Sequence, residues 1–239
     1  VVLLGMNLKR LLFGTLLLSF NLFVFSQSQI GSDIDGEAAA DFSGFSVSLS
    51  SEGSTVAIGA RYNDGNGADA GHVRIYKNIN GTWTQHGADI DGEAAGDQSG
   101  YSVSLSSDGS TVAIGANHNN GNGTDAGHVR IYKNISGTWT QQGADIDGEA
   151  AGDYSGFSVS LSSDGSTVAI GANLNDGNGA DAGHVRIYKN INGTWTQQGS
   201  DIDGEAAADF SGFSVSLSSD GSTVAIGANH NNGNGTNAG

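Results

Sequence analysis

The sequence predicts an all-β protein, a β-propeller-like array of four-stranded antiparallel blades whose ring is incomplete. Three observations lead to this prediction. The chain repeats with a period of 56 residues, as His72, His128 and His184 show. Each repeat contains short stretches in which large apolar residues alternate with small polar ones, which is the period of a β-strand. Asn-Gly and Asp-Gly pairs, which favour tight hairpin turns, separate these stretches.

The first 26 residues precede the repeats and predict a secretory signal peptide. Lys9 and Arg10 come before an apolar run at 11–25, which is interrupted and shorter than the roughly 20 residues of a spanning helix. Ser26 is the expected last residue before cleavage. The alternative is an uncleaved anchor helix. With cleavage, we expect a secreted protein, extracellular or on the outer cell surface, without a transmembrane segment.

The repeats cover residues 33–88, 89–144, 145–200 and 201–239, and the last has 39 of its 56 residues. Near-identical units of about this length are typical of stacked supersecondary structures. We therefore interpret residues 27–239 as one domain of repeated blades and the chain as a fragment of a longer array. A fragment with open ends is expected to self-associate or to be partly unfolded.

The second repeat shows the four expected strands. In residues 100–106 and 111–116 large apolar side chains alternate with Ser, Thr, Ala or Gly. Residues 128–135 and 138–142 are rich in β-branched and aromatic residues. Asp108-Gly109 is expected to turn the chain between the first two strands, as Asn80-Gly81 does between the last two strands of the first repeat. A longer loop joins the second and third strands.

The alternation gives each blade one face of large side chains and one of small ones. The large face of one blade can pack on the small face of the next, and sheets stacked in this way around an axis form a β-propeller. A calcium-bound β-roll is suggested by residues 65–71, but its nonapeptides occur in tandem, whereas this segment occurs once per repeat. An open β-solenoid and a β-sandwich array are also compatible with the alternation.

The composition excludes several functions. The chain has no Cys, so disulfides, thiolate zinc sites and cysteine nucleophiles are excluded. It has 25 acidic and 9 basic residues and a net charge of −16, so it lacks the basic footprint of a nucleic-acid-binding protein. Near-identical repeats also argue against an enzyme, because catalysis needs one differentiated constellation of residues.

The repeat resembles the FG-GAP repeat, the blade of the propeller of integrin α subunits, and especially its bacterial secreted relatives. The resemblance rests on residues 99–106, 112–116 and 127–132 of the second repeat and extends over 33–239. It implies a propeller that usually has seven blades, of which this chain supplies three and a part.

The chain departs from the family pattern at three places. Ser43, Ser99, Ser155 and Ser211 replace the Phe of Phe-Gly, and Arg61, Asn117, Asn173 and Asn229 replace the Pro of Gly-Ala-Pro. The acidic loop that binds calcium in some members is replaced by a short Ser-Ser-Asp-Gly-Ser connection. The family's metal site is therefore not expected at that position.

A different acidic segment, which opens each repeat, is a candidate calcium site. Several carboxylates within nine residues are able to surround a hard cation. The candidate ligands are Asp89, Asp91, Glu93 and Asp97, with Asp145, Asp147, Glu149 and Asp153 in the next repeat. The EF-hand spacing is not met, and the alternative is a solvated loop between blades.

Other candidates are weaker. Asp64, Asn66 and Asp69 offer oxygen ligands, but the later repeats replace Asp64 by Asn120 and Asn232. The repeated histidines are interpreted as structural residues at strand starts. Trp83, Trp139 and Trp195, which recur once per repeat, are interpreted as covers of their blades rather than as a platform for sugars.

These observations favour a secreted or cell-surface, non-catalytic binding or adhesion module whose partner is a protein or a glycan. A structural spacer in a large surface protein is the first alternative, and accessory repeats of an enzyme are the second. Variable, aromatic loops would favour binding, whereas uniform loops would favour a spacer, and the loops are nearly uniform in sequence.

Overall fold

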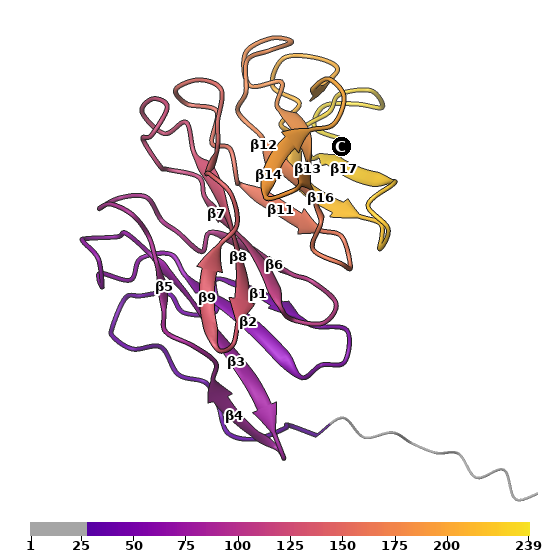
Figure 1. Cartoon of the computed structure of the whole chain (residues 1–239). Helices are drawn as coiled ribbons and strands as arrows, with labels where there is room; N and C mark the ends of the chain where they lie inside the picture. Colours follow the sequence, from indigo (N-terminus) through magenta and orange to yellow (C-terminus); the bar gives the residue numbers. More distant parts are fainter. Residues whose placement is uncertain (1–27) are drawn as a thin grey trace, which may run out of the picture.

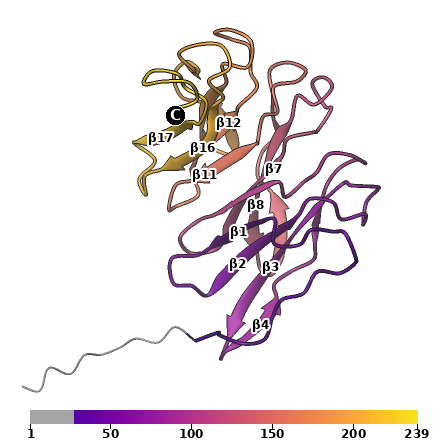
Figure 2. The ribbon, with the colours of Figure 1, turned by 180° about the vertical axis from the view of Figure 1, so that it is seen from behind.

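The computed structural model describes residues 28–239, and the predicted signal peptide of residues 1–26 lies outside them. All regular secondary-structure elements of residues 28–239 are β-strands, so the fold is all-β, as predicted. Among residues 28–239 no helix has the length and hydropathy needed to cross a membrane. Seen from both sides, the sheets follow one another from the N-terminal strands to β16 and β17 without closing into a ring (Figures 1 and 2).

The strands form four antiparallel sheets, which we call blades 1 to 4. Blade 1 contains β1 (Ser46–Leu49), β2 (Thr55–Ala60), β3 (His72–Ile79), β4 (Thr82–Gln85) and β5 (Ile90–Asp91). Blade 2 contains β6 (Ser102–Leu105), β7 (Thr111–Ala116), β8 (His128–Ile135), β9 (Thr138–Gln141) and β10 (Ile146–Asp147). Blade 3 contains β11 (Ser158–Leu161), β12 (Thr167–Ala172), β13 (His184–Ile191), β14 (Thr194–Gln197) and β15 (Ile202–Asp203). Blade 4 contains β16 (Ser211–Leu217) and β17 (Val224–Ala228).

The acidic segments of the second, third and fourth repeats each contribute a two-residue strand to the preceding blade, where only a loop was expected. In blade 1, β4 pairs with the second half of β3 and β5 pairs with its first half, so that His72 lies opposite Asp91. The interpretation as a solvated loop was wrong here, because Ile90 lies in the core between blades 1 and 2. Blades 1 to 3 therefore each take their last strand from the start of the following repeat.

The hairpin turns form where the dipeptides predict them. Asn80 and Gly81 have φ angles of 54° and 87°, and Gly109 has a φ of 68°. These left-handed values match the twist of a tight hairpin and are accessible to Gly and Asn at little cost.

Large side chains of one blade pack on small ones of the preceding blade, as predicted. Leu105 of β6 and Val112 and Ile114 of β7 share a core with Ala57 of β2. Strand β3 adds Val73 and Ile75 to the same core, and an equivalent core joins blades 2 and 3. Burying each large aliphatic side chain contributes about 1.5–3 kcal/mol, so these interfaces are the main source of stability.

Serines on the small face connect the first strands of adjacent blades. The Ser46 hydroxyl donates a hydrogen bond to the Gly100 carbonyl at 2.7 Å, and the Ser48 hydroxyl accepts one from the Leu105 amide at 2.9 Å. The same bonds recur at the next two junctions. The alternating serines thus hold consecutive blades at a fixed separation.

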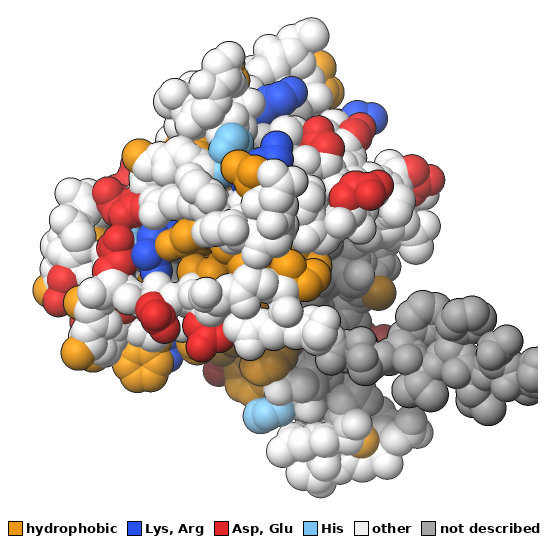
Figure 3. All heavy atoms as spheres, turned by 90° about the horizontal axis from the view of Figure 1, so that it is seen from below, with side chains coloured by type: hydrophobic (Ala, Val, Ile, Leu, Met, Phe, Trp, Pro, Cys, Tyr) orange, Lys and Arg blue, Asp and Glu red, His pale blue; other side chains and the backbone are white. Residues whose placement is uncertain are grey.

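The large face of blade 1 has no preceding blade in the described structure. Leu49 is 58% exposed, whereas the equivalent Leu105 and Leu161 are 7% exposed. Val47 beside it is also exposed. In the space-filling view, hydrophobic side chains gather near the middle of the visible face and acidic side chains lie around them (Figure 3).

Candidate functional site

One row of aromatic rings runs across the blades. Each ring comes from the residue just before β1, β6 or β11, or from the equivalent position within β16. The ring centroids of Phe45, Tyr101, Phe157 and Phe213 are successively 5.1, 5.0 and 5.1 Å apart. These separations lie in the range of favourable aromatic pairs. The fixed stacking of the blades therefore converts one aromatic residue per repeat into a continuous row.

A second set of rings lies beside this row. Phe42 and Tyr62, His118 and Tyr154, and Phe210 and His230 form edge-to-face pairs with centroids 5.2, 4.8 and 4.6 Å apart. The Arg61 guanidinium joins the two sets, because its carbon lies 3.9 Å from the Phe45 centroid and 4.4 Å from that of Tyr62. We call the surface formed by the eight Phe and Tyr residues of both sets the aromatic face.

Several rings of the aromatic face stand on strained backbone. Phe42, Tyr154 and Phe210 have φ angles of 54°, 56° and 55°. Bulky residues rarely adopt this left-handed conformation, which costs about 1–3 kcal/mol and tends to occur at functional sites. A turn closes here, since the Phe45 amide donates to the Phe42 carbonyl at 3.0 Å.

The repeats differ most in chemistry on this face. The position of Phe42 carries Gln98, Tyr154 and Phe210 in the later repeats. The position of Arg61 carries Asn in the later repeats, and that of Tyr62 carries His118, Leu174 and His230. Exchanges elsewhere are mostly between small or similar side chains, such as Asp64 with Asn120 and Ala68 with Thr124. The loops are therefore not uniform where they meet this face.

The predicted acidic ligands of one segment do not converge on one point. Asp89 approaches His72 of the first repeat, whereas Glu93 approaches His128 of the second. The carboxylate of Asp97 is buried and accepts hydrogen bonds from the Ala94 amide and the Asn119 side chain, both at 3.0 Å. The carbonyl of Asp91 accepts a hydrogen bond from Arg130 at 2.6 Å.

In the third repeat the equivalent acids separate in the same way. Asp145 approaches His128, and Glu149 approaches His184. Asp153 is buried and bonds the Ala150 amide and the Asn175 side chain. The carbonyl of Asp147 accepts from Arg186. Each segment thus contacts the histidines of two consecutive repeats instead of enclosing one ion.

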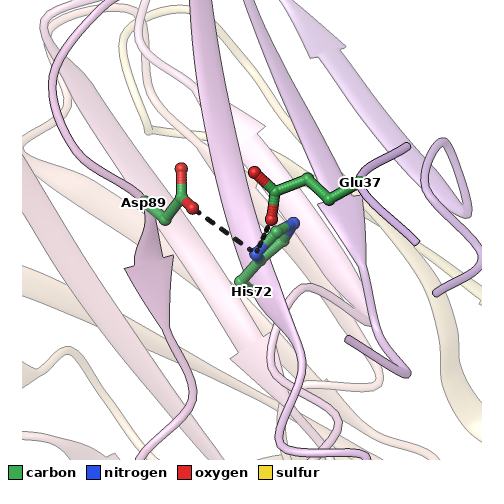
Figure 4. A group of neighbouring side chains, drawn as sticks. All are labelled: Glu37, His72 and Asp89. Carbon is green, nitrogen blue, oxygen red and sulfur yellow. Dashed lines mark ion pairs between the residues drawn. The ribbon is translucent and has the colours of Figure 1, made fainter. Parts of the chain in front are cut away.

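Each pair of consecutive repeats instead forms a cluster of one Glu, one His and one Asp. The clusters are Glu37–His72–Asp89, Glu93–His128–Asp145 and Glu149–His184–Asp201, each with its ligand atoms within 4.8 Å of one another. Figure 4 shows the first, with His72 on β3 between Glu37 and Asp89. Its Nδ1 lies 3.8 Å from Glu37 Oε2 and 4.0 Å from Asp89 Oδ2.

Burial keeps the histidines neutral. Desolvation, followed by the positive charge of Arg130, lowers the pKa of His128 to about 4. Desolvation lowers the pKa of His72 and of His184 as well. Burial also raises the pKa of Glu93, and the nearby Arg130 acts in the opposite direction. At neutral pH each cluster presents an uncharged imidazole beside carboxylates.

The remaining predicted candidates serve the backbone. Asp64 Oδ1 accepts a hydrogen bond from the Asp69 amide at 2.8 Å, and Asn120 Oδ1 accepts the equivalent bond in the second repeat at the same distance. This turn needs an acceptor and no charge, which explains why the repeats exchange Asp and Asn. The Trp139 indole N–H donates to the His86 carbonyl at 2.7 Å, tying the outer hairpin to the preceding repeat.

Neither the aromatic face nor the clusters were expected from the sequence. The histidines and the acidic segments lie apart in the sequence, but both recur with the same period and so meet in the fold. The varied positions are scattered along the chain and come together only through the turn before β1 and the end of β2. The signal that points to the aromatic face is the difference between repeats, position by position.

Comparisons with known proteins agree with the repeat. The family model described as the FG-GAP repeat matches residues 89–132 and 139–188. No curated protein matches the chain in sequence.

Three solved structures are similar to parts of the chain. A putative 6-phosphogluconolactonase from Bacteroides uniformis is similar with a TM-score of 0.52 and 13% identity, over 78% of this chain and 48% of that one. Hydrazine synthase from Kuenenia stuttgartiensis has a TM-score of 0.49 and 14% identity, over 81% of this chain and 43% of that one. Sqt1 from Saccharomyces cerevisiae has a TM-score of 0.48 and 14% identity, over 72% and 39%.

The chain spans less than half the length of each of these structures. At such identities the likeness concerns the fold alone. The two sequence matches identify residues 89–132 and 139–188 as FG-GAP repeats, and the blades of the structure agree with this assignment.

Proposed function

We propose that the chain is a non-catalytic binding or adhesion module that acts outside the cell and uses the aromatic face to bind a protein partner. The observation that carries the proposal is that the main chemical differences between near-identical repeats gather on this face. A spacer needs no such differences.

The composition of the face supports a protein partner. Tyr, Phe and Arg are enriched in the centres of protein–protein interfaces, and Tyr and Arg are frequent among the residues that dominate binding energy. Phe42, Phe45 and Phe213 are exposed, and Arg61 is partly exposed beside Phe45. The net charge of −16 favours a partner with a basic contact surface.

The test is a selection of peptide binders from a displayed library on the full chain, together with a glycan array. Binders are expected to lose at least tenfold in affinity for the double variant Arg61→Ala, Tyr101→Ala. The matched control is Ile79→Ala, Ile135→Ala, which removes two exposed apolar side chains at hairpin ends and is expected to bind normally. Glycan binding with the same dependence would replace the protein by a glycan. Binders indifferent to both variants would favour the spacer.

Localisation outside the cell remains part of the proposal and rests on the predicted signal peptide. Expression of the full chain in a secreting host tests it. N-terminal sequencing of the secreted product is expected to begin after Ser26. Retention of the intact N-terminus in the membrane fraction would favour the anchor helix instead.

A further inference from the structure

The Glu–His–Asp clusters contain buried imidazoles without a hydrogen-bond partner. His128 and His184 are each 1% exposed, and neither ring nitrogen of either residue makes a hydrogen bond. A buried polar group left in this way costs about 1–3 kcal/mol. This cost recurs at the two equivalent histidines. A ligand that accepts the lone pair of an imidazole nitrogen would remove part of it.

The unpartnered nitrogen points at two carboxylates. His128 Nδ1 lies 3.8 Å from Glu93 Oε2 and 3.8 Å from Asp145 Oδ2. These distances are too long for hydrogen bonds but close to the separation of about 3.4 Å between ligands of a tetrahedral zinc ion. The three ligand atoms lie within 4.8 Å of one another, and the Glu93 side chain is half-exposed and free to move closer.

We propose that each cluster binds a divalent transition-metal ion through one imidazole nitrogen and two carboxylate oxygens, with zinc as the best match. An imidazole suits zinc, whereas calcium takes oxygen ligands, so the donor set departs from the calcium site expected from the acidic segment alone. Three protein ligands leave the fourth tetrahedral position to water.

Arg130 supports the site from outside. Its Nη1 lies 3.6 Å from Glu93 Oε1, so that the other carboxylate oxygen, Oε2, faces His128. A charged group that orients a ligand in this way typically increases the metal affinity of a site. The two carboxylates together balance the charge of the ion.

The ions would cross-link consecutive repeats. In each cluster the Glu and His belong to one repeat and the Asp to the next. Metal binding would therefore stabilise the junction between repeats, because an ion that binds only the folded state shifts the folding equilibrium towards it.

The first test measures zinc bound to the full, chelator-treated, tag-free chain by calorimetry and by elemental analysis. Three zinc ions per chain are expected, falling to two in His128→Gln. The matched control is His118→Gln, which removes a histidine of the same repeat that contacts Asp125 outside the clusters. The control is expected to keep all three ions. Zinc is also expected to raise the melting temperature of the wild type more than that of His128→Gln.

A second variant keeps the proposal testable if His128→Gln does not fold. Glu93→Gln removes a half-exposed carboxylate and is likewise expected to bind two ions. Bound Co²⁺ is expected to show the visible absorption of a tetrahedral site, reduced by about one third in this variant. The absence of saturable zinc binding, or a stoichiometry that Glu93→Gln leaves unchanged, overturns the proposal.

Discussion

Gly115→Ala tests the distance at which the blades pack. A Cβ on Gly115 would overlap the Gly156 carbonyl oxygen of blade 3 and the Ser102 hydroxyl, and it would lie 3.0 Å from the Gly156 carbonyl carbon. The backbone of Gly115 needs no left-handed conformation, so lack of space is the only obstacle. Overpacking costs about 1–3 kcal/mol. The displaced hydrogen bond from Ser102 to Gly156 adds about 1 kcal/mol.

Gly152→Ala is the matched control. A Cβ at Gly152 would meet nothing within 4 Å, and its φ of 85° is close to the 71° of Ala40, which occupies the equivalent position in the first repeat. The left-handed backbone costs an alanine about 1 kcal/mol. Gly115→Ala is therefore expected to lower the free energy of unfolding by about 2–4 kcal/mol, clearly more than the control.

Urea denaturation followed by tryptophan fluorescence measures both variants. The slope of the transition has to be compared as well, because repeat proteins unfold in units when a junction weakens. Equal destabilisation by the two variants would refute the close approach of blades 2 and 3 at Gly115.

Three further predictions concern charge, the outer hairpin and the open end. Two serine hydroxyls and one amide bond the Asp164 carboxylate and lower its pKa below 3.8. The stability that this carboxylate contributes is therefore present above its unfolded pKa and is lost as the pH falls through the folded pKa. Asp164→Asn is expected to lower the melting temperature at pH 7 and to change it little at pH 2.5, and an equal loss at both pH values would contradict this reasoning. Trp139→Phe removes an indole bond to a carbonyl and is expected to cost about 1 kcal/mol in urea denaturation, whereas an unchanged midpoint would show that the bond contributes nothing. The exposed Val47 and Leu49 are expected to drive self-association, so their replacement by Ser should reduce the sedimentation coefficient at high concentration, while Ile135→Ser, at an equally exposed hairpin end, should not; equal effects would point to non-specific hydrophobicity.

The strands and their stacking are predictable from the sequence, because the alternation of large and small residues lies within each strand. The second and third strands of the second repeat begin and end where the alternation predicts, at residues 111–116 and 128–135. The first strand is shorter than predicted, because the Tyr101 amide bonds the Gln98 carbonyl and turns the chain before Ser102. Gly100, with a φ of 84°, takes the left-handed position of this turn, so the glycine predicted as the first strand residue belongs to the turn instead.

The clusters and the fifth strand depend on contacts between repeats. Ile146 and Asp147 are too short a segment to show any period, and they become a strand only by pairing with Val129 and His128 of the preceding repeat. The same pairing brings Asp145 to His128. A sequence pattern places residues along one repeat and does not specify which repeat their partners occupy.

The division between uniform and varied positions has a physical cause. Ser102, Gly115 and Arg130 each contact a neighbouring blade and are identical at their equivalent positions in every repeat that contains them. A change at such a position weakens a junction, and in a stacked array each junction contributes to the stability of its neighbours. Positions such as those of Phe42 and Tyr62 face away from the junction cores and are free to change without this cost. Neutral drift alone would scatter such differences over all surface positions that lie outside the junctions. Their concentration beside a row of aromatic rings, on strained backbone that stability alone does not favour, is the argument that this face binds a partner.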